Sequence, residues 1–171
     1  LERGARSAYA TAPDFEDGLH VFVCGSAPPR PAPGRAQGCI AVVTPEHYFV
    51  VDAGSGSGNN LGLGQLTAER LDGVLLTHFH SDHIVDLPSI NLTSWAAGRK
   101  DALRVFGPDG VAQVVDGFNG ALAQDRVYRT RHHGRDFMPA EAGLLQAVPI
   151  AMDEAMAFGD LSITAFPADH E

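Results

Sequence analysis

No stretch of this 171-residue chain approaches the roughly 20 consecutive apolar residues that a membrane-spanning helix needs, so we expect no membrane association. Positive charge is also scarce: 12 Lys and Arg stand against 21 Asp and Glu, and the net charge of −9 disfavours a general polyanion-binding surface. Cysteine is limited to Cys24 and Cys39, too few for a disulfide framework. The two fall in neighbouring expected strands, where one bond is conceivable, but we expect two buried thiols because free cysteine is so often interior.

The chain also lacks an internal repeat and any segment typical of a leader. It begins at Leu1 rather than Met, without a basic stretch followed by an apolar one, so we expect a processed or cut N-terminus. The sequence does not decide between a cytoplasmic location and a periplasmic or secreted one. A homo-oligomer is also compatible with it. With 44% hydrophobic and 19% charged residues, the chain can bury one core, which predicts a single domain over residues 1–171.

Strands are expected first, followed by an alternation of strands and helices. Residues 19–24, 38–44 and 47–52 have the short apolar pattern of strands, and four prolines within residues 28–33 predict an irregular loop between the first two. The other expected elements are a Gly-rich connection at 54–64, a short helix within 61–69, a strand at 73–77, a helix at 86–97, a strand at 103–106, a helix at 110–123, a polar loop at 126–138, and strands at 146–150 and 161–166. This order predicts an α+β domain with helices covering a sheet and functional side chains in loops at strand ends.

The most informative segment is His78-Phe79-His80-Ser81-Asp82-His83, which places three imidazoles and one carboxylate directly after the expected strand 73–77. In an extended segment side chains alternate between faces, so His78 and His80 point to the same side and can bind one ion. If a helix follows, Asp82 and His83 project differently and can face a second ion. Imidazole nitrogen and carboxylate oxygen are the usual ligands of catalytic zinc, and two adjacent ions suit hydrolysis.

This segment resembles the HxHxDH signature of the metallo-β-lactamase superfamily, and other segments continue the resemblance in order. Residues 49–56, with Asp52 at a strand end, look like the strand and Asp-Gly element that precede the signature. Residues 21–28 look like the first strand and Gly-rich turn of the ribonuclease Z and arylsulfatase-like branch, and residues 105–110 continue that branch's order. The resemblance implies an αββα metallo-β-lactamase fold, of which this chain holds mainly the first β-sheet with its covering helices, as the N-terminal part of the domain.

The resemblance also implies a ligand set for two metal ions. The implied ligands are His78, His80 and His170 for one ion, and Asp82 and His83 for the other. A bridging aspartate and a last histidine would lie beyond Glu171. We therefore expect two zinc ions in the complete site and one well-ligated zinc in this chain.

For the whole enzyme the resemblance implies a zinc-dependent hydrolase that uses a metal-bound hydroxide. Asp82 has a further expected role as the catalytic residue, because its free oxygen can orient the nucleophile and take up its proton. Asp52 is expected to hold the motif loop in shape by accepting hydrogen bonds. An ordinary turn aspartate is an equally good interpretation of Asp52.

The sequence favours a phosphodiester or sulfate ester over tRNA as substrate. The ribonuclease Z branch carries a basic loop, Pro-x-Lys-x-Arg-Asn, near its first strand; the comparable residues 31–36 keep the arginine, as Arg35, but lack the lysine and asparagine. Together with the acidic net charge, this disfavours tRNA and makes a small ester the expected partner. Two alternatives stay open: hydrolysis at a carbon centre, as in a lactone or β-lactam, and a metal-binding module without turnover.

Two further groups of residues, a short basic stretch and two histidines at strand borders, have weaker signals. Arg131, His132 and His133 belong to a short basic stretch that would contact phosphate or sulfate near the site, although a solvated loop is the favoured interpretation. His20 and His47 border expected strands, and we expect both to be structural.

Overall fold

The computed structural model describes Phe15, residues 17–30 and residues 32–169, and its main element is a six-stranded sheet in which the strands follow chain order. The strands are β1 (His20–Gly25), β2 (Cys39–Val43), β3 (Tyr48–Val51), β4 (Gly73–Leu75), β5 (Leu103–Gly107) and β6 (Leu145–Pro149). β1, β2 and β3 pair antiparallel, whereas β3, β4, β5 and β6 pair parallel. The parallel half therefore places four successive carboxyl strand ends at one edge of the sheet.

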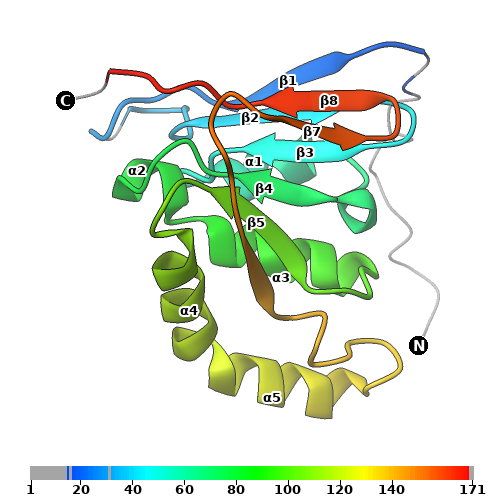
Figure 1. Ribbon diagram of the computed structural model, residues 1–171. Helices are drawn as coiled ribbons and strands as arrows, with labels where there is room; N and C mark the ends of the chain where they lie inside the picture. The colour runs from blue at the N-terminus through cyan, green and yellow to red at the C-terminus, as the bar shows by residue number, and fades with distance from the viewer. Residues whose placement is uncertain (1–14, 16, 31, 170–171) are drawn as a thin grey trace.

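Helices cover one face of this sheet, and a β-hairpin covers part of the other (Figure 1). The helices are α1 (Ser57–Leu63), the 3₁₀ helix η1 (Ala68–Arg70), α2 (Ser81–Ile84), α3 (Leu87–Ala97), α4 (Val111–Ala121) and α5 (Ala123–His133). The hairpin consists of β7 (Ala155–Phe158) and β8 (Leu161–Thr164), which form a separate two-stranded antiparallel sheet. Among the described residues, no helix combines the length and the apolar character needed to cross a bilayer.

The central strands are apolar on both faces because both faces are covered. Val50, Val74 and Val105 lie in the core shared with α1, α3 and α4. Their neighbours along the strands, Phe49, Leu75 and Phe106, point to the opposite face, where they pack against β7 and β8. The period-two alternation of strand side chains thus divides the apolar residues between two cores.

The carboxyl end of α3 is held by a buried arginine. Arg99 donates from Nη1 to the carbonyl of Ala142 at 2.8 Å and from Nη2 to Oδ1 of Asn91 at 2.5 Å. Desolvation lowers the pKa of Arg99 to about 10, while the charge of Asp101 opposes that shift, so the guanidinium remains charged at neutral pH. The charged hydrogen bonds tie α3 to the segment that leads into β6.

Cys24 and Cys39 form a disulfide between β1 and β2, so the expectation of two buried thiols was wrong. The pairing of β1 with β2 shifts register between Val23 and Gly25, and this irregularity lies beside Cys39. The two Cα atoms are 5.0 Å apart, within the range that a disulfide spans. Strand patterning alone does not give the register, which is why the sequence did not decide between the thiols and the bond.

Three other expectations about local structure were wrong. Residues 126–138 were expected to be a loop, but most of them belong to α5, a polar helix with an Arg129–Asp125 ion pair at 2.8 Å. The short helix expected within 61–69 lies earlier, as α1, where the Asp86 carboxylate accepts a hydrogen bond from the Gly58 N–H at 2.7 Å. β7 was not expected at all. In each case a tertiary or ion-pair contact outweighs a weak local preference.

Candidate metal centre

Candidate functional groups collect at the edge of the sheet where the parallel strands β3, β4 and β5 end. Asp52 follows β3, the motif residues 78–83 follow β4, and residues 108–110 form the connection from β5 to α4. Phe79 packs against this last connection, because a Cβ atom on Gly110 would lie 3.2 Å from its ring. Open sheets with parallel strands place their ligand sites at this kind of edge.

The three histidines of the motif form one cluster of imidazole rings. Nε2 of His78 lies 3.0 Å from Nδ1 of His80, and the ring centroids of His78 and His83 are 4.2 Å apart. The helix α2 begins at Ser81, directly after His80, and turns the ring of His83 back toward that of His78. Two ligand atoms on one tetrahedral zinc are about 3.3 Å apart, so the nitrogens of His78 and His80 have the spacing of a pair of metal donors.

Asp82 adds a carboxylate to this cluster. The residue is buried, and its Oδ2 lies 3.5 Å from Nε2 of His83. Imidazole nitrogens and one carboxylate oxygen are the chemistry that zinc prefers, so the described donor set fits a zinc ion.

Asp52 connects the motif loop to the end of β3. Its Oδ1 accepts a hydrogen bond from the Thr77 N–H at 2.9 Å, and its Oδ2 lies 2.8 Å from Nδ1 of His83. The Thr77 hydroxyl also donates to the carboxylate, at 3.0 and 2.9 Å. Asp52 has a φ of 61°, a left-handed conformation that aspartate tolerates better than most residues. These contacts match the supporting hydrogen bonds expected of Asp52, while its role in a metal site stays a prediction.

The contacts of Asp52 fix the tautomers of two histidines. A carboxylate only accepts, so Nδ1 of His83 carries the hydrogen of its contact and the Thr77 hydroxyl gives its hydrogen to Asp52. The Thr77 oxygen then accepts from Nδ1 of His78, 2.9 Å away. Nε2 of both His78 and His83 then carries the ring's electron pair, the arrangement usual for metal-ligating histidines. In the structure, Nε2 of His78 lies 3.0 Å from Nδ1 of His80, and Nε2 of His83 lies 3.5 Å from the Asp82 carboxylate.

Three supporting residues were missed by the sequence reasoning: Gly38, Gly54 and Thr77. A Cβ atom on Gly38 would lie 3.2 Å from Nδ1 of His83, so the backbone before β2 packs directly on that ring. A Cβ atom on Gly54 would collide with the Asp82 carbonyl and approach Cβ of Gln37 to 2.6 Å. The glycines allow this close approach of backbone to the motif, and only their position beside recognised elements hinted at it.

Other predicted site residues are not brought to the cluster within the described chain. His170 lies outside the described residues. Arg131, His132 and His133 are exposed in the last turn of α5, which Figure 1 shows at the other end of the molecule from α2. The ring of His133 lies 4.6 Å from that of His132 and 6.2 Å from that of Phe137. Their contact with substrate therefore stays a prediction that no described contact supports.

Comparison with known proteins assigns the class. Residues 47–171 match the family model described as "Beta-lactamase superfamily domain", and the chain belongs to this family. More particularly, it is 36% identical over 118 residues to Ribonuclease Z of Mycobacterium marinum, covering 67% of this chain and 42% of the relative. It is 33% identical over 160 residues to Ribonuclease Z of Mycobacterium bovis (strain BCG / Pasteur 1173P2), covering 89% of this chain and 54% of the relative. The chain thus spans about half the length of the curated relatives it matches.

Solved structures share the fold. The metallo-beta-lactamase fold protein YhfI of Bacillus subtilis aligns with a TM-score of 0.60 and 21% identity, over 87% of this chain and 52% of that one. Zn(2+)-bound PqqB of Methylobacterium extorquens aligns with a TM-score of 0.55 and 18% identity, over 86% and 55%. Human tRNase Z, short form, aligns with a TM-score of 0.52 and 24% identity, over 59% and 38%. The predicted superfamily, its fold and the likeness to ribonuclease Z are confirmed, whereas the arylsulfatase-like part of the resemblance stays a prediction.

Proposed function

We propose that the protein is a zinc-dependent hydrolase whose site is built on residues 78–83 and supported by Asp52. The observation that carries the proposal is the tautomer control described above. One buried carboxylate orients His83 directly and His78 through Thr77, so that Nε2 is the unprotonated nitrogen of both rings and the two rings lie in one cluster. Both hydrogen bonds prepare the imidazoles to bind a metal.

In this proposal His78, His80, Asp82 and His83 hold zinc together with His170, which lies outside the described residues. Zinc, when bound, lowers the pKa of a water molecule toward ~7 and stabilises negative charge on the substrate. Asp82 keeps one carboxylate oxygen for the water, where it orients the nucleophile and takes up its proton. Asp52 and Thr77 keep the imidazoles in place while the reaction proceeds.

A phosphodiester or sulfate ester of small size is the proposed substrate. The ribonuclease Z relatives support phosphodiester chemistry. The net charge of −9 and the incomplete basic loop at residues 31–36 support a small substrate over a polyanion, which would need many Lys or Arg contacts. RNA is the second candidate, and the names of the same relatives are the observation in its favour.

The experiment is a substrate panel assayed with zinc-loaded protein: bis(p-nitrophenyl) phosphate, p-nitrophenyl sulfate, a lactone, a β-lactam and a precursor tRNA. We expect turnover of the phosphodiester or the sulfate ester to exceed that of the others. Preferred hydrolysis of the lactone or β-lactam would support the carbon-centre alternative. Tight tRNA binding with a steep salt dependence would put RNA processing first, and no turnover of any substrate would support a metal-binding module.

A further inference from the structure

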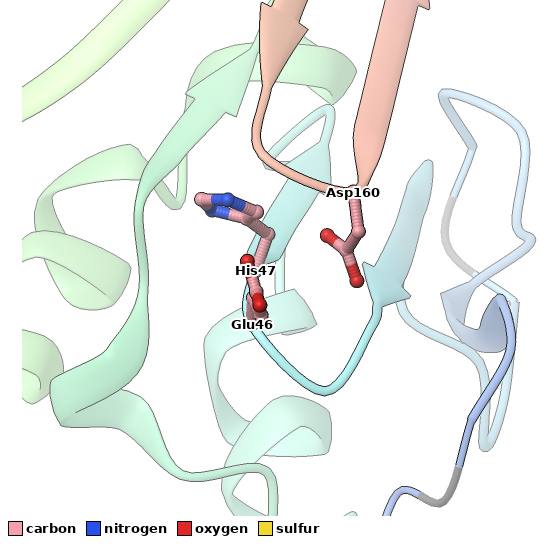
Figure 2. A group of neighbouring side chains, drawn as sticks. All are labelled: Glu46, His47 and Asp160. Atoms are coloured by element: carbon pink, nitrogen blue, oxygen red, sulfur yellow. The ribbon is translucent and has the colours of Figure 1, made fainter.

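A second group of possible metal ligands lies at the opposite end of β3 from the motif. Glu46 and His47 belong to the turn between β2 and β3, and Asp160 belongs to the turn between β7 and β8. One ligand atom from each of the three lies within 4.8 Å of the others. Figure 2 shows the three side chains where the two turns meet. The group therefore joins two segments that are far apart in the sequence.

The two turns approach each other closely at Gly159. A Cβ atom there would lie 2.9 Å from both Oε2 of Glu46 and Nε2 of His47, and Gly159 has a φ of +48°. Only glycine suits both conditions, so the backbone is shaped to bring the β7–β8 turn onto these two polar atoms. Asp160, the next residue, then presents its carboxylate to the same place.

His47 is prepared to act as a ligand by a carboxylate outside the group. Its Nδ1 lies 3.1 Å from Oδ2 of Asp72, which also accepts the Tyr48 N–H at 2.9 Å. Since the carboxylate can only accept, Nδ1 carries the hydrogen and Nε2 keeps its electron pair. This carboxylate–histidine arrangement is the one that fixes metal-ligating imidazoles.

The charges around the group favour a cation. Within the part of the chain that the structure describes, no Lys or Arg forms a salt bridge with Glu46 or Asp160. The nearby Arg70 donates to the carbonyls of Thr44 and Pro45, and Arg104 lies 3.6 Å from Asp72. Two carboxylates therefore face an imidazole electron pair without a basic partner of their own.

We propose that Glu46, His47 and Asp160 bind a divalent transition-metal ion that fastens the β7–β8 hairpin to the six-stranded sheet. One imidazole and two carboxylates suit ions of the zinc and manganese kind, with water completing the coordination. Ligand atoms on one such ion lie at most about 4.2 Å apart, so a small movement of the exposed Glu46 side chain closes the site. The proposal concerns a different site from the hydrolytic centre and does not rest on it.

A metal at this place would add to the contacts that hold the β7–β8 hairpin on the six-stranded sheet. The Thr44 hydroxyl donates to Oδ1 of Asp160 at 3.0 Å, leaving the second oxygen of that carboxylate for the ion. Beside it, the ring of Phe158 packs against Phe49 and Phe106 at centroid distances of 4.8 and 5.8 Å. The ion would add a link between the two sheets at the end of this aromatic contact.

The test uses the full chain carrying His78→Ala and His80→Ala, which removes competition from the motif. Zn²⁺ titration by calorimetry in this background should show one ion per chain, and the same ion should raise the midpoint of thermal unfolding. Adding Asp160→Asn, which keeps an oxygen for the Thr44 hydroxyl, or His47→Gln should weaken Zn²⁺ affinity at least tenfold and abolish the shift of the midpoint.

Asp153→Asn is the matched control, because Asp153 is an exposed aspartate that precedes the same hairpin and lies outside the group. It should leave both measurements unchanged. Circular dichroism establishes that each variant is folded, and Mn²⁺ in place of Zn²⁺ shows whether the site accepts the wider class of ion. The proposal is overturned if the background chain binds no Zn²⁺ up to millimolar concentration, or if binding survives both Asp160→Asn and His47→Gln.

Discussion

The two ends of β3 carry the same local pair, a histidine whose Nδ1 faces an aspartate, in different surroundings. At the carboxyl end His83 lies 2.8 Å from Asp52, and at the amino end His47 lies 3.1 Å from Asp72. At the carboxyl end the loops after β3, β4 and β5 meet, and the Cys24–Cys39 disulfide lies at the neighbouring end of β2. At the amino end two turns meet, and Glu46 and Asp160 are exposed there.

This difference shows how one histidine–aspartate pair suits two tasks. At the carboxyl end the pair belongs to a cluster of motif histidines held by Thr77 and Asp52, as chemistry on a substrate requires. At the amino end the pair lies where two turns meet, so an ion there can join separate pieces of the chain. The following four predictions test the contrast, from the largest expected free-energy change to the smallest.

Removing the disulfide tests how far the carboxyl end depends on its covalent link. The bond joins residues separated by 15 positions, and closing a loop of that size stabilises a fold by about 3 kcal/mol. Cys24→Ser with Cys39→Ser should therefore lower the free energy of unfolding by about this amount in urea titrations. Reduction of the unmutated protein should give the same change; a midpoint that is insensitive to reductant would contradict the prediction.

Removing an imidazole from the motif tests whether the carboxyl end is the catalytic one. His80→Ala takes away one proposed ligand and should reduce turnover of the preferred ester about 100-fold. That loss corresponds to about 2.7 kcal/mol of transition-state stabilisation. His20→Ala, a histidine at the start of β1, is the control and should keep its activity. Near-normal turnover in His80→Ala would remove the hydrolase proposal.

Asp52→Asn tests the hydrogen bonds that orient the motif. An amide offers one acceptor oxygen in place of two, so either Thr77 or His83 loses its partner, and turnover should fall about tenfold. Asp153→Asn is a matched control because Asp153 also has a left-handed φ, of 62°, but is exposed. Steady-state kinetics with saturating zinc would detect the difference, and equal activity of the two variants would mean that Asp52 is an ordinary turn aspartate.

Phe158→Leu tests the packing at the amino end of β3. The ring of Phe158 contacts Phe49 and Phe106, and the guanidinium of Arg104 lies 5.6 Å from its centroid. Loss of these aromatic contacts should lower the free energy of unfolding by about 1 kcal/mol without changing turnover. Phe166→Leu, at a side chain that is 70% exposed, should change neither quantity in denaturant titrations and activity assays.

The sequence predicted most of the sheet and the closeness of the motif histidines because both depend on short-range patterns. The apolar strand before His78 and the spacing of the motif are local, and β4 and α2 follow from them. α5 was missed because its stability comes from polar contacts such as Arg129–Asp125 rather than from an apolar stripe. The disulfide was missed because it depends on strand register.

The sequence alone did not predict the group formed by Glu46, His47 and Asp160, for a different reason. His47 borders a strand, and we expected it to be structural. Its contact with Asp72 agrees with a structural role. Asp160 comes close only because β7 and β8 fold back over the sheet, and the hydrogen bond that records this joins residues 116 positions apart. No spacing rule connects side chains at that separation, so only the folded chain brings them together.

The order of strands in the main sheet has a consequence for how the chain folds during synthesis. Each strand from β2 to β6 is hydrogen-bonded to the one made just before it, so each of these strands finds a partner that has already been translated. Since the amino end leaves the ribosome first, the sheet can lengthen one strand at a time with few unpaired edges exposed to aggregation. The β7–β8 hairpin pairs only with itself and reaches a surface of Phe49 and Phe106 that is already complete.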